Sequence, residues 1–296
     1  MCRFSTSYRI AVTAPAFVSR ASDVLSAAAA LQRAGAVCTL GASCFLPRRF
    51  TPSDDKMRAG ELTRFLCSDA YDIVLCCRGG YGSARLLPYL DATALQRASA
   101  VLCGYSDITA LHAFLFSYCG RCGVHGLMAA TDFANGNVPR SAFAAFSDCF
   151  EKAEMTLELE PLFPARQTVF GRLLGGNLSV FTSLCGTRFF PDCRGSILFL
   201  EEVGEKEYRL DRMLTELRLA GVFRSARAVI FGSLSLGSAA AEQRFLRRFF
   251  ADDEVAVYTC RKIGHIRRNV SIPFGMPACI CGEALTARCG LFSLGK

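Results

Sequence analysis

The stretch AVLCGYSDITALHAFLFSY, residues 100–118, contains the transition that decides the fold. Its first four residues are apolar and suit a short buried strand, Gly104 permits a tight turn, and residues 108–118 have helical periodicity. A strand that turns directly into a helix is the building unit of parallel α/β sheets. The turn holds the motif Gly104-Tyr105-Ser106-Asp107 at the carboxyl end of the strand.

Strand and helix patterns also alternate through the rest of the first half. Strands are predicted at 8–14, 36–40 and 73–77, and helices at 22–34, closed by Gly35, and at 56–67. The sequence therefore predicts a doubly wound parallel sheet. Ligands of such sheets bind beyond the carboxyl ends of the strands. Two glycine-bearing loops, Arg78–Gly82 and Gly104–Asp107, follow such ends.

The second half has a different pattern, and its last part is richer in glycine, proline and turns. Strands are predicted at 196–200 and 226–232, and a helix at 209–220 is closed by Gly221. The polar, proline-bearing segment 151–164 is interpreted as a linker. We expect two domains, 1–150 and 165–296, with the division within 140–170.

Composition limits the class of protein. The chain has 296 residues, of which 51% are hydrophobic, so it can bury a sizeable core and is not globally disordered. Its longest apolar stretches, such as 226–236, are too short to cross a bilayer, and residues 1–10 lack the apolar region of a signal peptide. We expect a cytoplasmic protein without a membrane partner.

The net charge of +8 comes almost wholly from dispersed arginines, because the chain has only five lysines. No basic stripe or nucleic-acid-binding module is recognisable, so no nucleic-acid partner is expected. Arginine suits paired hydrogen bonds to carboxylates, which favours a small acidic substrate. The 16 cysteines lie mostly in apolar runs of a large chain, where reduced thiols are expected.

Ser106 is the first candidate for chemistry. A serine at a strand-to-helix turn has an exposed hydroxyl, and the helix N-terminus offers N–H groups to a developing oxyanion. Ile108 stands where an ordinary nucleophile elbow has its second glycine. The alternative is that Ser106 or Asp107 caps the helix, since both residue types are preferred there.

The loop Arg78–Gly82 has two interpretations besides an ordinary tight turn. It lacks the third glycine of a dinucleotide fingerprint, and no phosphate-loop lysine is present. Its glycines would let a backbone N–H approach a reacting carbonyl, as an oxyanion hole requires.

Three histidines restrict the choice of a general base. His112 lies within the predicted helix, where a structural role is favoured, whereas His125 and His265 lie in loop-like segments and rank level. Glu201 and Glu202 follow a buried strand, where a carboxylate would be placed to orient a histidine. Solvated loop acids are the alternative interpretation.

Cys119 and Cys122, with His125 nearby, have the spacing of half a zinc site. Cys279, Cys281 and Cys289 would have to supply the remaining ligands, and no second closely spaced pair matches the first. Chance spacing in a cysteine-rich chain is the favoured interpretation.

Taken in order, these segments resemble the LD-carboxypeptidase family of serine peptidases. The resemblance runs nearly end to end, and its order is more specific than any single motif. It is carried by IAVTAP (10–15), RGGYGSARLLPYLD (78–91), GYSDITALH (104–112), HG (125–126), LGGNL (174–178), LFLEE (198–202) with Tyr208 and DR (211–212), GH (264–265) and PFG (273–275). Ala16-Phe17 departs from the small polar residue and glycine expected after the first strand.

The resemblance implies a catalytic triad of Ser106 as nucleophile, Glu201 as acid and His265 as base. It implies an oxyanion hole from the backbone N–H groups of Gly80 and Asp107. The implied fold is a flavodoxin-like N-terminal domain and a smaller α/β C-terminal domain with the active site between them. A homodimer without metal or cofactor is also implied.

The reaction implied is release of the terminal D-alanine from murein tetrapeptides, a muropeptide substrate. Two rivals are hydrolysis of a peptidyl-nucleotide amide, as an immunity peptidase performs, and a non-catalytic α/β protein that binds a small ligand. The residues expected to bind substrate lie in or beside the predicted site loops: Arg78, Gly79, Tyr81, Arg172 and Arg267.

Overall fold

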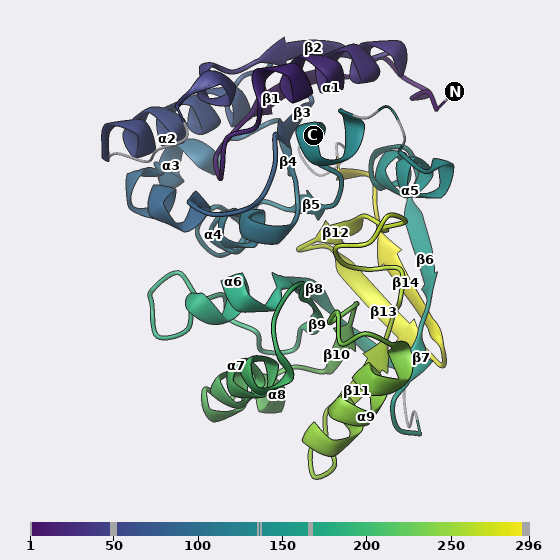
Figure 1. The fold of residues 1–296 in the computed structure, drawn as a ribbon. Helices are drawn as coiled ribbons and strands as arrows, with labels where there is room; N and C mark the ends of the chain where they lie inside the picture. The colour runs from purple at the N-terminus through teal and green to yellow at the C-terminus, as the bar shows by residue number, and fades with distance from the viewer. Residues whose placement is uncertain (1, 48–51, 135, 137, 165–167, 292–296) are drawn as a thin grey trace.

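The computed structural model describes residues 2–47, 52–134, 136, 138–164 and 168–291, with only the backbone for Pro52 and Ser53. Two β-sheets lie one above the other in Figure 1, the first near the N-terminus and the second below it. The start of the predicted second domain, residue 165, lies outside the described residues, and the domain boundaries stay a prediction.

The first sheet has the strand order β12-β5-β4-β3-β1-β2. Its strands are β1 (Arg9–Thr13), β2 (Val37–Leu40), β3 (Ile73–Cys76), β4 (Val101–Cys103), β5 (Gly123–His125) and β12 (Ile272–Phe274). The first five are parallel in the order 2-1-3-4-5, which is the flavodoxin-like order, so the predicted fold of the first half is confirmed. β12 joins antiparallel to β5, so the second half of the chain completes the first sheet.

Helices cover both faces of this sheet because alternate strand residues point to opposite sides. Ile10 and Val12 pack with α1 and α5, whereas Ala11 packs with α2 and α4. The helical elements here are α1 (Ala21–Arg33), η1 (Ala42–Phe45), α2 (Pro52–Leu66), η2 (Ser83–Tyr89), α3 (Ala92–Leu95), η3 (Ser106–Ile108), α4 (Thr109–Cys119), the π-helical turn η4 (Ala129–Phe133) and α5 (Arg140–Glu151). The predicted helix ends agree with the observed ones to within a few residues. Gly35 follows the end of α1 with a φ of 97°, a conformation common after helices.

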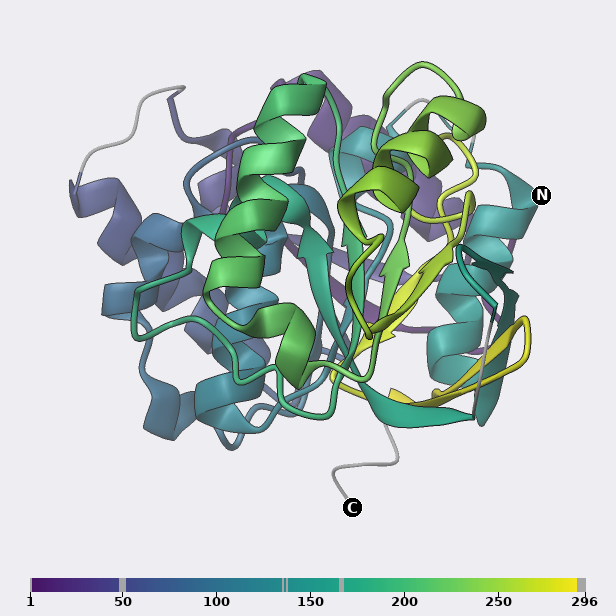
Figure 2. The same ribbon diagram turned by 90° about the horizontal axis from the view of Figure 1, so that it is seen from below.

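The second sheet is mixed and has the order β6-β14-β13-β8-β9-β10-β11-β7. Its parallel centre, β8 to β11, is flanked by antiparallel strands. The elements are β6 (Glu154–Glu158), β7 (Glu160–Pro161), β8 (Val169–Asn177), α6 (Leu178–Ser183), β9 (Ile197–Glu201), α7 (Glu207–Leu219), α8 (Val222–Ser225), β10 (Ala228–Phe231), α9 (Ala239–Phe249), β11 (Ala256–Thr259), β13 (Pro277–Cys281) and β14 (Ala284–Arg288). Seen from below, α7 and α9 lie in front of this sheet (Figure 2).

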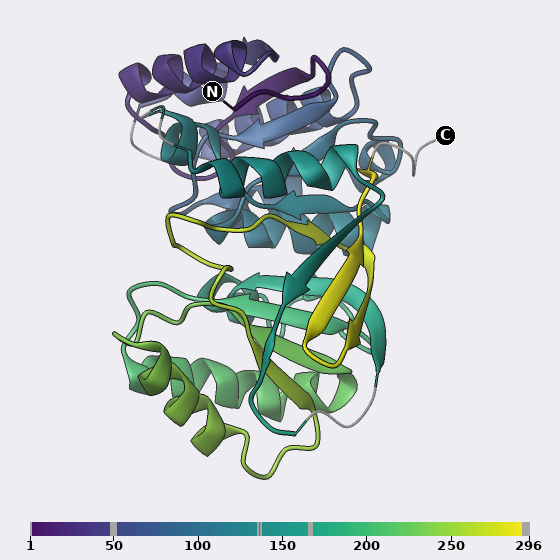
Figure 3. The same ribbon diagram turned by 90° about the vertical axis from the view of Figure 1, so that its right-hand side faces the viewer.

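The interpretation of 151–164 as a linker is wrong. This segment forms β6, paired with β14, and β7, paired with β11. Figure 3 shows β6 running down from α5 beside the β13–β14 hairpin. The alternation of buried Met155 and Leu157 with exposed Glu154, Thr156 and Glu158 gives the strand its one buried face. Pro161 is tolerated because β7 is an edge strand.

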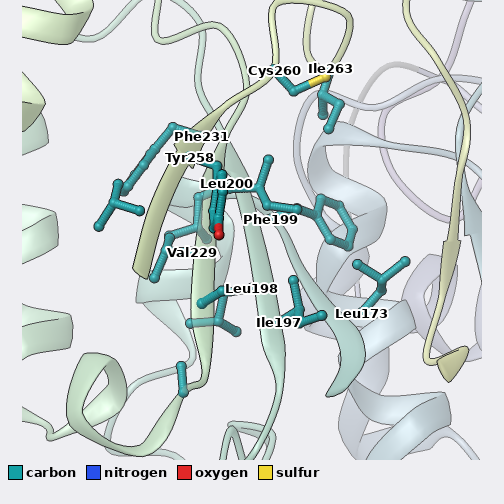
Figure 4. Packing of buried hydrophobic residues seen from close by; sticks show 14 of the residues in the cluster. Leu173, Ile197, Leu198, Phe199, Leu200, Val229, Phe231, Tyr258, Cys260 and Ile263 are labelled. Carbon is teal, nitrogen blue, oxygen red and sulfur yellow. The ribbon is translucent and has the colours of Figure 1, made fainter. Parts of the chain in front are cut away.

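The core of the second half is built on the parallel strands. Strand β9 is buried at every residue, as strands covered on both faces are. Figure 4 shows Leu198 and Phe199 packed among side chains from β8, β10 and β11, which include Leu173, Val229 and Tyr258. Across the described residues, no helix combines the length and apolar character that crossing a bilayer needs.

Candidate active site

Ser106 lies in the turn between β4 and α4, where its backbone has a φ of 63°. A residue with a side chain rarely adopts this left-handed conformation, which costs on the order of 1–3 kcal/mol. Such strain is held by the surrounding structure and gathers at functional sites. Here it follows Gly104, whose φ is 156° and whose missing side chain leaves room for Ile108 and Cys76.

The helix-capping interpretation of this turn is wrong. Ile108 occupies the N-cap of α4, and no side chain caps it. The buried carboxylate of Asp107 instead accepts a hydrogen bond from the Ser83 backbone N–H at 2.8 Å, and Ser83 Oγ donates to the Asp107 carbonyl at 2.5 Å. Burial raises the pKa of Asp107, and the Ser83 hydrogen bonds oppose that rise. These two hydrogen bonds hold the end of the Arg78–Gly82 loop against the serine turn.

Gly79 brings that loop directly against the serine. A methyl group on Gly79 would lie 2.7 Å from Ser106 Cβ, 2.9 Å from Ser106 Oγ and 3.4 Å from the Asp107 backbone N. Only glycine fits, because these separations are shorter than carbon and oxygen atoms tolerate. Gly80, with φ of 109°, follows in a conformation that glycine adopts freely. The backbone of the glycine loop and that of Asp107 thus converge on the serine hydroxyl.

Replacing Gly79 by alanine is expected to lower kcat/KM by about 100-fold or more, because the new methyl group displaces the serine side chain from its present position. Gly79 lacks a left-handed φ, so the alanine backbone itself is unstrained, but the crowding against Ser106 should lower the stability by about 1–3 kcal/mol, and kcat/KM is therefore measured per folded molecule. Gly60→Ala in α2 is the matched control, because a methyl group there meets nothing within 4 Å. Wild-type kcat/KM in Gly79→Ala would show that the contact does not matter.

Glu201 and His265 form the second half of the site. Glu201 is the last residue of β9 and is fully buried, and His265 Nδ1 lies 2.7 Å from its Oε2. With Nδ1–H donating to the carboxylate, Nε2 is free to accept a proton. Burial lowers the pKa of His265. The hydrogen bond and charge of Glu201, together with the charges of Glu202 and Asp132, raise this pKa by more than burial lowers it, so the net shift is upward.

Two contacts join the serine turn and the start of α4 to the second half of the chain. The Tyr105 ring meets the His265 ring edge-on, with centroids 5.0 Å apart, so the residue before Ser106 touches the histidine. Thr109 Oγ1 accepts a hydrogen bond at 3.0 Å from the backbone N–H of Asn177 at the end of β8. The carboxyl ends of both sheets therefore meet at this point, as the position of ligand sites in α/β sheets predicts.

Glu202 serves this junction as a structural acid. Its carboxylate accepts hydrogen bonds from Asn177 Nδ2 at 3.2 Å, Ser179 N at 2.7 Å and Val203 N at 2.9 Å. Neither acid is the solvated loop residue of the alternative interpretation, because both are buried. The role of Asn177 went unpredicted; its place in the motif LGGNL was the only signal in the sequence.

His125 and His112 are core residues. His125 is fully buried in β5, its ring meets those of Tyr105 and Phe199, and burial holds its pKa well below the usual value. His112 Nε2 bonds the Gly104 carbonyl oxygen at 2.9 Å and so supports the turn, and burial lowers its pKa to about 4. The carboxylate of Glu201 contacts His265 rather than either of these rings.

Asp132 is an acid near His265 that sequence reasoning missed. It lies in the π-helical turn η4, a rare geometry that is frequent at functional sites. Its Oδ2 accepts a hydrogen bond from the Met128 backbone N–H at 2.8 Å. Burial raises its pKa to about 6, and the charge of His265 opposes the rise, so the two groups share one electrostatic environment. No motif in the sequence marks this residue.

The residues expected to bind substrate separate into two groups. Arg78 lies in the glycine loop with its guanidinium 5.6 Å from the Phe17 ring centroid, and Tyr81, 59% exposed, follows it. Arg267 is exposed two residues after His265. Arg172 lies five residues before the end of β8, about 16 Å along the strand, and donates to the Gly275 carbonyl oxygen at 2.9 Å. The structure therefore does not bring Arg172 to the site.

The half zinc site predicted as an alternative is not completed. Within the described residues, His, Cys, Asp and Glu side chains nowhere gather in a group of three that would suit a metal ion. Cys119 ends α4 with a buried thiol, and burial raises the pKa of the Cys122 thiol. All 16 cysteines are free thiols.

Comparison with known proteins assigns the chain to a family. Residues 10–126 match the LD-carboxypeptidase N-terminal domain and residues 170–280 match the LD-carboxypeptidase C-terminal domain. The murein tetrapeptide carboxypeptidase of Pseudomonas aeruginosa is 32% identical over 94% of each chain. The crystal structure of muramoyltetrapeptide carboxypeptidase from Oxalobacter formigenes superposes with a TM-score of 0.84 at 26% identity, covering 94% of this chain and 97% of that one.

A third relative is named for a different role. The microcin C7 self-immunity protein MccF of Escherichia coli is 23% identical over 90% of this chain and 88% of its own. The two domain matches, the near-complete coverage and the identity to the Pseudomonas protein together show that this chain belongs to the LD-carboxypeptidase family and is a serine-type carboxypeptidase.

Proposed function

We propose that the protein releases the terminal D-alanine from murein tetrapeptides, in the recycling of peptidoglycan, through an acyl-enzyme on Ser106. The observation that carries the proposal is the convergence of Gly79, the strained Ser106 and the His265–Glu201 pair where the two sheets meet. Relatives named as murein peptide carboxypeptidases support the substrate class.

In the proposed mechanism, Ser106 Oγ attacks the carbonyl carbon of the last peptide bond while His265 Nε2 takes the hydroxyl proton. The backbone N–H groups of Gly80 and Asp107 donate hydrogen bonds to the oxyanion. His265 then protonates the leaving amine, the C–N bond breaks and D-alanine departs. Water then attacks the ester while His265 takes a proton from it, and His265 returns this proton to Ser106 Oγ as the ester bond breaks and the shortened peptide leaves.

Buried Glu201 holds the imidazole with Nδ1 protonated and stabilises the imidazolium that forms in each half-reaction. Arg78, beside Gly79, is proposed to hold the terminal carboxylate of the substrate. The cytoplasmic location, the homodimer and the absence of metal, cofactor and nucleic-acid partner stay predictions that belong to this proposal.

The substrate is tested by offering tetrapeptide, pentapeptide, C-terminally amidated tetrapeptide and a peptidyl-adenylate analogue, with products identified by mass spectrometry. We expect D-alanine release from the tetrapeptide, little action on the pentapeptide, and cleavage of the amidated form slower by about 10–100-fold, because the guanidinium loses its charged partner. In Arg78→Gln this difference between free and amidated peptide should shrink.

Two outcomes would change the assignment. Equal cleavage of free and amidated tetrapeptide would remove the arginine contact and leave the triad standing. Preference for the peptidyl-adenylate would place the protein with the immunity peptidases. The likeness to MccF favours that alternative.

A further inference from the structure

A cavity of about 350 Å³ opens beside the site, between the loop that carries His265, the C-terminal end of α1 and the N-terminal end of α5. Its volume falls in the range of about 300–1,000 Å³ that is typical of small-molecule sites. Arg267, two residues after His265, is the lining residue nearest in sequence to the triad, and Cys2 and Ala34 also line the cavity. Among the described residues, the lining includes no member of the triad or of the glycine loop.

Three arginines line this one cavity: Arg33, Arg140 and Arg267. Among the described residues, its lining includes no aspartate or glutamate, and none of the three guanidinium groups forms an ion pair there. Arginines elsewhere do form such pairs, as Arg85 does with Asp55 at 2.7 Å. The three arginines are exposed at one cavity, so an anion bound there would meet several guanidinium groups and no lining carboxylate among the described residues.

Helix stabilisation does not account for this arrangement. Arg33 is the last residue of α1, where a cation is favourable, but Arg140 is the first residue of α5, where the helix dipole makes a cation unfavourable. The α5 N-terminus also lacks a side-chain cap, so its free N–H groups add to the positive potential. The two effects point to a negative group in the cavity.

The rest of the lining is apolar. Phe133, Val138 and Phe143 contribute hydrocarbon surface beside the arginines. Phe133 follows Asp132, which shares the electrostatic environment of His265, so this wall also connects to the site. A cavity with an apolar floor and several convergent guanidinium groups suits a carboxylate carried on a larger organic framework.

We infer that this cavity binds a carboxylate of the part of the peptide that stays on the enzyme as the acyl group. The inference rests on the proposed function. A carboxypeptidase releases a single residue, whose carboxylate is assigned above to Arg78, whereas the retained stem peptide is larger and carries further free carboxylates. The larger fragment requires the larger space, and the loop that carries His265 also contributes Arg267 to the cavity.

The test compares Arg33→Gln, Arg140→Gln and Arg267→Gln with Arg244→Gln, an exposed arginine on α9 outside the cavity. Each cavity variant is expected to raise KM for the tetrapeptide about 10-fold, with kcat within about twofold of wild type, because one charge-assisted hydrogen bond to the bound substrate is lost. Arg244→Gln should match wild type. On a tetrapeptide whose non-terminal carboxylates are amidated, the cavity variants and wild type should have similar KM values.

Titration calorimetry with the tripeptide product separates this inference from the proposed function, because it needs no turnover. The cavity variants should bind the product about 10-fold more weakly than wild type and Arg244→Gln. Unchanged product affinity in all three variants, or a KM increase that persists on the amidated substrate, would overturn the inference. Product binding that depends on these arginines in a protein that releases no D-alanine would refute only the proposed reaction.

Discussion

Replacing Ser106 or His265 by alanine is expected to lower kcat by on the order of 10⁴–10⁶, with either single change costing nearly as much as both together. The two side chains act on the same proton in the proposed mechanism, so each is useless without the other. The hydroxyl is the only group lost in Ser106→Ala, and the strained backbone is retained by the surrounding turn. Steady-state release of D-alanine and an active-site titration would measure the loss.

Ser235→Ala is the matched control for the serine, because Ser235 also has a left-handed backbone, with φ of 57°. Its hydroxyl donates to the Glu202 carbonyl oxygen at 3.3 Å, so kcat should stay within about threefold of wild type. A fluorophosphonate probe should label the wild type and Ser235→Ala but leave Ser106→Ala unlabelled. Labelling of Ser106→Ala would place the nucleophile elsewhere.

For the base, His125→Ala is the informative comparison. His125 is fully buried, so the change should lower the melting temperature through the cavity that it creates. Its kcat per folded molecule should nevertheless far exceed that of His265→Ala. If His125→Ala were inactive and His265→Ala were active, the general base would be His125 rather than His265.

The first sheet could be predicted because its central strands are buried on both faces and its helices alternate with the strands. Ile73–Cys76 is apolar at every position, and the glycine-bearing turn after β4 marks the passage to α4. These are local signals of period and turn chemistry, which a sequence displays directly.

The prediction for segment 151–164 was wrong because the evidence that it forms strands is not local in the sequence. The alternation of Met155 and Leu157 with polar residues spans only five residues, and the proline made the segment resemble a connection. Its strand identity depends on partners more than 90 residues away, since Leu157 pairs with Leu285 and Pro161 with Tyr258. Tertiary pairing of this kind overrides local preference. The addition of β12 to the first sheet was unpredictable for the same reason.

At the site, the residues alone could not choose between His125 and His265; the family resemblance made the choice. The contact between His265 and Glu201 joins residues 64 positions apart, which only the folded chain displays. Gly79 was expected to contact substrate, yet its nearest neighbours are Ser106 and Asp107. Asp132 escaped notice because burial, rather than a motif, gives it its unusual pKa.

Replacing Glu201 by glutamine is expected to lower kcat by on the order of 10³–10⁴, less than loss of the serine or histidine. The amide keeps the shape of the side chain but lacks the charge that stabilises the imidazolium, and its NH2 group can force the imidazole into the wrong tautomer. Glu202→Gln is the matched control. It alters a neighbouring buried acid whose partners are Asn177, Ser179 and Val203, so kcat should fall by no more than about 10-fold.

The pH dependence of kcat/KM gives a second readout of Glu201 that a merely structural role would not move. His265 must be neutral to accept the serine proton, so activity rises with pH through its pKa. That pKa lies above the ordinary 6.5 because the hydrogen bond and charge of Glu201 outweigh the burial that lowers it. In Glu201→Gln the burial remains while the charge is gone, so the acid limb of the residual activity should move to lower pH. Profiles measured from about pH 5 to pH 9 would show the shift. An acid limb at the wild-type position, or one moved upward, would mean that Glu201 does not control the protonation of the base.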